Sequence, residues 1–140
     1  LKIIPERPEL IKNKRVLVIE DGPTLTHGEL ATGAAFLAAK EHGAREIVDP
    51  RKNAVGSIKS IYEKYTHLQL VLPAMGYSKQ QINELEETIN ATDCDLVIVG
   101  TPINLKRLLK INKPVIRVRY EIEEIGRPNL EDVLKDFKYI

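Results

Sequence analysis

The stretch from Glu20 to Gly28 carries the densest set of groups that could do chemistry. Two acidic residues are followed by glycine, proline, two threonines, a histidine and a second glycine. Hydroxyls and free amides at the start of a helix favour bound anions, so the phosphate-binding candidates here are Thr24, Thr26, His27 and Gly28. Carboxylates hold hard cations, so Glu20 and Asp21 are candidates for Mg²⁺, with Asp21 as the metal residue. An alternative stays open, in which Thr26 only caps a helix and Asp21 only forms a turn.

Two further phosphate-binding candidates follow later strands. Arg51 lies two residues after Asp49, and the pair either faces a phosphate or forms an ordinary surface ion pair. Thr101 follows the apolar run that ends at Gly100, and with Pro102 after it we expect Thr101 to cap a short helix. Arg117 and Arg119 share one strand face that either binds an anion or is simply solvated.

Other familiar arrangements are missing from the sequence. It contains neither the phosphate-binding P-loop pattern nor a G-x-G-x-x-G after a strand. The three histidines and the single cysteine, Cys94, lack metal-ligand spacing, and His27 has no fixed acidic partner for a triad. The catalytic residues therefore stay unknown, and Cys94 is expected to be a structural residue.

Alternating strands and helices must position these groups. Apolar runs predict five strands, at 15–20, 46–49, 68–72, 95–100 and 114–120. Helical spacing and caps predict helices from Thr26 to about Glu41, from Ser57 to Tyr65, from Ser78 to Asn90, from Thr101 to Lys110 and from Leu130 to Phe137. This order predicts an α/β fold, an open, mainly parallel five-stranded sheet with helices on both faces, which is Rossmann-like. Ligands then bind beyond the carboxyl ends of the strands.

We expect residues 1–14 to be a lead-in or linker and residues 15–140 to be a single α/β domain. The length of 140 residues suits one domain, and the first residue, Leu1, suggests a piece of a longer chain. A net charge of +1 and an aromatic content of 5% argue against a nucleic-acid partner, and no apolar run is long enough to cross a membrane. One cysteine fits a cytoplasmic location.

Several strings of the sequence resemble the archaeal cyclic 2,3-diphosphoglycerate synthetases and related predicted GTPases. The resemblance extends from about Lys14 to Ile125. The strings that carry it are 18–28, 46–51, 54–58, 72–77, 88–90, 100–103 and 111–114.

The resemblance implies a nucleotide-binding ligase, of which this chain is similar to the C-terminal domain. Such an enzyme uses ATP to close an intramolecular phosphoanhydride, with Mg²⁺ and ATP or GTP as cofactors. An upstream P-loop domain is the implied partner, and a phosphorylated small molecule is the implied ligand. The isolated chain is expected to be inactive. The alternative is a non-catalytic docking module of a predicted GTPase, or a dimerisation module that makes a homo-oligomer.

Overall fold

The structure is a computed structural model that describes residues 2–21, 33–68, 70–76, 78–101 and 104–121. A mixed sheet of six strands forms its centre, in the order β1-β6-β5-β2-β3, and β4 also pairs with β2. The strands are β1 (Lys2–Pro5), β2 (Arg15–Asp21), β3 (Glu46–Ile47), β4 (Leu72–Ala74), β5 (Leu96–Val99) and β6 (Val115–Glu121). All described pairings are parallel except that of β1 with β6. The predicted α/β fold class is therefore confirmed.

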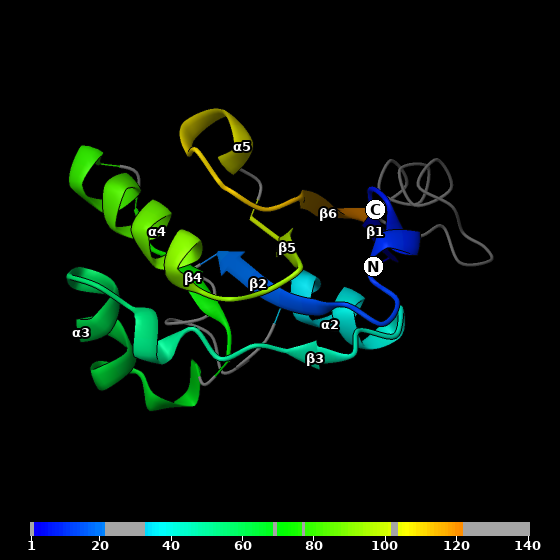
Figure 1. Cartoon of the computed structure of the whole chain (residues 1–140), viewed down its shortest axis with the longest axis horizontal. Coiled ribbons are helices and arrows are strands. Elements are labelled where there is room, and N and C mark those ends of the chain that lie inside the picture. Colours follow the sequence, from blue (N-terminus) through cyan, green and yellow to red (C-terminus); the bar gives the residue numbers. More distant parts are fainter. Residues whose placement is uncertain (1, 22–32, 69, 77, 102–103, 122–140) are drawn as a thin grey trace, which may run out of the picture.

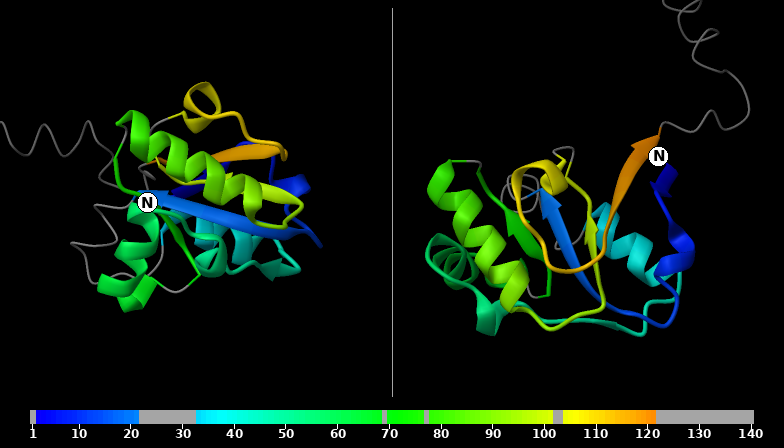
Figure 2. Two further views of the ribbon diagram at one scale, coloured as in Figure 1. Left: turned by 60° about the vertical axis from the view of Figure 1, so that its left-hand side comes forward. Right: turned by 45° about the horizontal axis from the view of Figure 1, so that its top comes forward.

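Four helices cover the two faces of this sheet in the described part of the chain. They are α2 (Ala34–Glu41), α3 (Ser57–Lys64), α4 (Lys79–Ala91) and α5 (Leu105–Leu108). Figures 1 and 2 show α2 on one side of the sheet and α4 on the other. Single 3-10 turns lie at Pro8–Leu10, Arg51–Asn53 and Thr66–Leu68.

The two central strands explain this layering. In β2, Val16 and Val18 pack with the alanines of α2, whereas Leu17 and Ile19 pack with α3, α4 and α5. The same alternation continues in β5. Successive side chains of a strand point to opposite faces, so a continuous apolar run is buried on both sides.

The first fourteen residues differ from the expected lead-in. Strand β1 pairs antiparallel with β6, from Lys2 opposite Glu121 to Pro5 opposite Val118. Ile11 is fully buried in the core. The two prolines suggested a linker, but Pro5 ends an edge strand and Pro8 opens a 3-10 turn, which are positions that tolerate a missing N–H.

Several element boundaries also differ from the sequence predictions. Helix α2 begins at Ala34, after an extended N-cap residue, Gly33. The predicted helix start at Thr26, with its capping partner Glu29, lies outside the described residues. Helix α5 is capped by Asn104, whose side chain accepts from the Lys106 amide, so Thr101 does not cap it. Leu68 was assigned to the third strand but ends a 3-10 turn, and that strand begins only at Leu72.

Two local predictions are confirmed. Ser78 and Gln81 form a reciprocal capping box at the start of α4. Helix α3 begins at Ser57 as expected, although Gly56 is the N-cap.

Strand β3 is shorter than predicted and ends at Ile47. The predicted helix at 130–137 lies outside the described residues.

Candidate functional site

The carboxyl ends of β2 and β5 meet around a buried carboxylate, that of Glu20. Its side chain accepts three backbone N–H groups from the start of α2. Gly33 and Phe36 donate to Oε2 at 3.0 and 2.9 Å, and Ala35 donates to Oε1 at 3.1 Å. Glu20 is only 2% exposed. It therefore caps α2 from a residue that lies 13 to 16 positions earlier in the chain.

Two glycines make room for this carboxylate. A Cβ on Gly100 would lie 2.2 Å from Glu20 Oε1, and one on Gly33 would lie 2.9 Å from the carboxyl carbon. Neither glycine adopts a left-handed backbone, so space and not conformation requires glycine here. The Gly100 amide also donates to the Ile19 carbonyl at 2.8 Å and joins the ends of the two strands.

Burial and hydrogen bonding act on Glu20 in opposite directions. Burial raises the pKa of the Glu20 carboxyl group, and the three amide bonds offset part of this rise. Because both carboxylate oxygens accept amides, they are engaged within the protein. The expectation that Glu20 helps to hold Mg²⁺ is therefore wrong, and the amides at the start of α2 are closed to an external phosphate.

The predicted residues at this edge have different outcomes. Asp21 is half-buried at the end of β2, opposite Ala74 of β4. Strand alternation places it on the sheet face opposite Glu20. Thr101 is 1% exposed and follows Gly100. Four candidates lie outside the described residues: Thr24, Thr26, His27 and Gly28.

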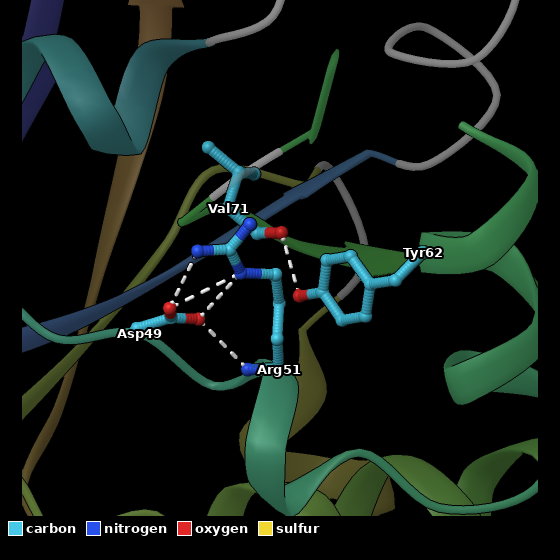
Figure 3. A network of polar contacts seen from close by, with 4 residues as sticks. All are labelled: Asp49, Arg51, Tyr62 and Val71. Atoms are coloured by element: carbon cyan, nitrogen blue, oxygen red, sulfur yellow. Dashed lines mark hydrogen bonds and ion pairs between the residues drawn. The ribbon is translucent and has the colours of Figure 1, made fainter. Parts of the chain in front are cut away.

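Arg51 is engaged in a forked ion pair with Asp49 (Figure 3). Its Nη2 donates to Oδ2 at 2.7 Å, and its Nε lies 2.9 and 3.1 Å from the two carboxylate oxygens. The pair is half exposed, and Arg51 holds the pKa of Asp49 below its usual value. Arg51 was expected either to face a phosphate or to form a surface ion pair with Asp49, and the structure shows the ion pair.

The position of this pair along the sheet separates it from Glu20. The Val48 amide bonds to the Val16 carbonyl, so the chain leaves the sheet at Asp49, well before β2 ends at Asp21. Tyr62 lies beside the pair and donates to the Val71 carbonyl at 2.7 Å (Figure 3). Burial raises the pKa of the Tyr62 phenol. Asp49, Arg51 and Tyr62 therefore lie beside the middle of β2 and not at its carboxyl end.

A third polar group, not found from the sequence, joins α3 to α4. Ser57 donates to Glu84 through its hydroxyl at 2.6 Å and its amide at 3.2 Å. The Ser57 hydroxyl is the main reason that the pKa of Glu84 is lowered. Val55 donates to Thr88 Oγ1 at 3.4 Å, and a Cβ on Gly56 would clash with the Glu84 carboxylate. No pattern in the sequence around Glu84 indicated this contact, because its partner, Ser57, lies 27 residues earlier.

A small pocket lies beside this contact, at the carboxyl end of β4. Three segments line it: Ser57, Ile58 and Ile61 of α3, residues 73–76, and Gln81 and Leu85 of α4. The lining is mostly apolar. The amides of Ser57, Ser78 and Gln81 already bond to side chains of the chain itself.

Two of the strings that suggested a family have structural roles. The side chain of Asn90 on α4 donates to the Lys110 carbonyl at 2.8 Å and accepts from the Asn112 amide at 2.9 Å. Lys113 donates to the carbonyls of Ile89 and Asn90, both at 3.2 Å. These contacts bind the end of α4 to the segment before β6, so the strings at 88–90 and 111–114 hold the fold together.

Within the described ranges, no three histidine, cysteine or acidic side chains gather as a metal site. Asp21 is the metal candidate that remains, and a single carboxylate suits Mg²⁺ only where phosphate oxygens or water complete the shell. Among the same residues, no helix is long and apolar enough to cross a membrane.

Comparison with known proteins gives one informative match. The chain is 61% identical over 135 residues to a protein of Thermococcus kodakarensis named "Arginine synthetase ArcE". The match covers 96% of this chain, which spans 30% of the length of that relative. No family model and no solved structure matches the chain. The name of this relative indicates a synthetase, as expected, and it refers to arginine and not to 2,3-diphosphoglycerate.

Proposed function

We propose that this chain is one domain of an arginine-forming synthetase that couples bond formation to cleavage of a nucleoside triphosphate. The 61% identity to a protein named an arginine synthetase, extending over 96% of the chain, is the observation that carries the proposal. The general class, a ligase, agrees with the family resemblance in the sequence. The product differs, so arginine replaces the cyclic phosphoanhydride as the proposed product.

The proposed role of the domain is to bind a phosphorylated ligand, either a nucleotide or a phosphorylated intermediate. The site is the edge where β2 and β5 end, since ligands of open parallel sheets bind outside the carboxyl ends of the strands. Asp21 and Thr101 lie at this edge, next to the segment that contains Thr24, Thr26, His27 and Gly28. In phosphoryl transfer, positioning and charge neutralisation contribute most of the rate, and these are the tasks we assign to the domain.

Asp21 is the residue proposed to hold Mg²⁺ there, and the ion would neutralise charge on phosphate oxygens. Arg51 lies apart from the ends of β2 and β5, in its ion pair with Asp49, and is proposed only as a separate anion contact. Its fork with Asp49 leaves other guanidinium N–H donors for an anion, since arginine carries five. ATP and GTP both fit this chemistry.

The alternative, a docking or dimerisation module, has less support. The two large apolar side chains that are well exposed among the described residues are Leu37 at 46% and Leu108 at 43%. They lie on α2 and α5, which belong to different core clusters. Single apolar residues on a surface are ordinary and do not make an interface.

A chimera tests the proposed product. The matched region of the Thermococcus kodakarensis protein is replaced by this chain, and arginine formation is measured under conditions in which the unaltered protein forms arginine. The control is the same protein with the region deleted. We expect the chimera to form arginine and the deletion to form none. A folded chimera without arginine formation would contradict the proposal, and so would full activity of the deletion.

A further inference from the structure

Glu20 joins three elements that end at the same edge of the sheet. It belongs to β2, it accepts the amides at the start of α2, and its Oε1 lies against Gly100 at the end of β5. A buried carboxylate with three amide donors has one well-defined position, because any displacement leaves a charge or several N–H groups unsatisfied.

Two residues follow these ends: Asp21, which is half-buried and is the ligand candidate, and Thr101, which is 1% exposed and supports the site from within. Asp21 is next to Glu20 in β2, and Thr101 is next to Gly100 after β5. The Gly100 amide bonds to the Ile19 carbonyl, so the ends of β2 and β5 are joined next to Glu20. A displacement of Glu20 therefore displaces Asp21 and Thr101 together.

Glu20 does not itself reach a ligand. It is 2% exposed, and both its oxygens are used within the protein. It also lies on the face of α2, opposite to Asp21. Its effect on a ligand must pass through neighbouring residues.

We propose that Glu20 is a positioning residue for the ligand site: held by the amides of Gly33, Ala35 and Phe36 and by the space at Gly100, it fixes Asp21 and Thr101 relative to each other. This inference rests on the proposed function, since it assumes a phosphorylated ligand at this edge. It adds that ligand affinity depends on a carboxylate that the ligand does not touch.

The test compares Glu20→Gln and Glu20→Ala by calorimetric titration of the 140-residue chain with Mg·ATP and with inorganic tripolyphosphate. Glutamine keeps the shape of the side chain, and its oxygen can retain the two bonds from Gly33 and Phe36. Alanine loses all three bonds. Small displacements of positioned groups have large effects, so we expect Glu20→Ala to weaken binding about tenfold or more and Glu20→Gln to restore most of the affinity.

The control variant separates positioning from general loss of stability. Thr92 is 2% exposed, donates to the Thr88 carbonyl at 2.7 Å and is the C-cap of α4, before the amino end of β5 and away from the site. Thr92→Val is expected to lower the unfolding temperature and to leave both affinities unchanged. All titrations are made well below the unfolding temperature of each variant, and circular dichroism confirms that each is folded.

The outcomes are distinguishable. If wild type binds neither probe, the proposed ligand site fails, and this inference fails with it. If wild type binds and Glu20→Ala binds equally well, only the role of Glu20 is overturned. If Thr92→Val weakens binding as much as Glu20→Ala does, the effect reflects stability and Glu20 is not a positioning residue.

Discussion

Substituting Gly100 by alanine tests the geometry around Glu20 most sharply. The new Cβ would lie 2.2 Å from Glu20 Oε1, and contacts below 3.0 Å essentially never occur. Because Glu20 Oε1 is the nearest atom, we expect the carboxylate to move by at least 0.8 Å, the difference between these two distances. A shift of this size breaks the 3.1 Å bond from the Ala35 amide to Oε1.

The magnitude follows from the interactions lost. A hydrogen bond to a charged group contributes about 1.5–3 kcal/mol, and overpacking a core costs about 1–3 kcal/mol. We expect Gly100→Ala to lower the free energy of unfolding by about 2–5 kcal/mol, and Glu20→Ala by about 3–5 kcal/mol, since it leaves three N–H groups without a partner. In a chain of this size each kcal/mol lowers the unfolding temperature by about 2–4 °C.

The double variant decides whether the two effects share one cause. Without the Glu20 carboxylate the alanine at position 100 meets mainly the Ala35 amide nitrogen, at 3.0 Å. The combined loss in Glu20→Ala/Gly100→Ala should therefore be at least about 1 kcal/mol smaller than the sum of the single losses. Urea unfolding followed by circular dichroism measures all three variants.

A matched glycine provides the control. At Gly43 a new Cβ would have Lys12 Cγ as its nearest neighbour, at 3.9 Å, so it would not clash. Because the φ of Gly43 is +78°, Gly43→Ala lowers stability through backbone strain instead. Gly43→Ala should add to Glu20→Ala within about 0.5 kcal/mol. If the losses of Gly100→Ala and Glu20→Ala add equally well, the new Cβ does not act through the Glu20 carboxylate, and the proposed contact between them is wrong.

Four further predictions concern other parts of the chain. Tyr62→Phe removes the donor to Val71 and should lower the free energy of unfolding by about 1–2 kcal/mol in urea titrations. The pKa of Tyr62 is raised, so its contribution is present below pH 10 and is lost as the pH rises further and the unfolded phenol ionises. The pKa of Asp49 is lowered by Arg51, so Asp49→Asn should cost a little stability at pH 7, and the difference from wild type should vanish as the pH falls below the ordinary value of 3.8. Burial raises the pKa of Cys94, which is 9% exposed, so a thiol reagent should label it slowly in the native state and rapidly in urea, and rapid native labelling would contradict this. The purified chain should release no phosphate from ATP or GTP above background, because its sequence has no P-loop, and turnover that survives repurification would contradict this.

The sequence predicted the features that depend on neighbouring residues. The apolar runs that begin at Val16 and Leu96 are buried on both faces, which only a central parallel strand allows. The Ser78 capping box spans three residues and forms as expected. Such features need no knowledge of the rest of the fold.

Features that depend on distant residues were missed or misassigned. Glu20 looked like a cation ligand, but it caps helix α2, whose N-cap residue, Gly33, lies 13 positions later. Strand β1 pairs with β6 more than a hundred positions away, so no local pattern marks it. The same holds for Glu84, whose partner Ser57 lies on another helix. Side-chain caps and edge strands of this kind become visible only when the elements are assembled.

The most direct test of the central claim is a two-dimensional ¹H–¹⁵N NMR titration of the chain with Mg·ATP, tripolyphosphate, 2,3-diphosphoglycerate and arginine. We expect saturable shifts from at least one phosphorylated probe, concentrated on the amides of Asp21, Gly33, Gly100 and Thr101. The amino edge of the sheet, marked by the amides of Arg15 and Asp95, should stay unchanged. Shifts confined to that amino edge, or no shifts with any phosphorylated probe, would contradict the proposed ligand site.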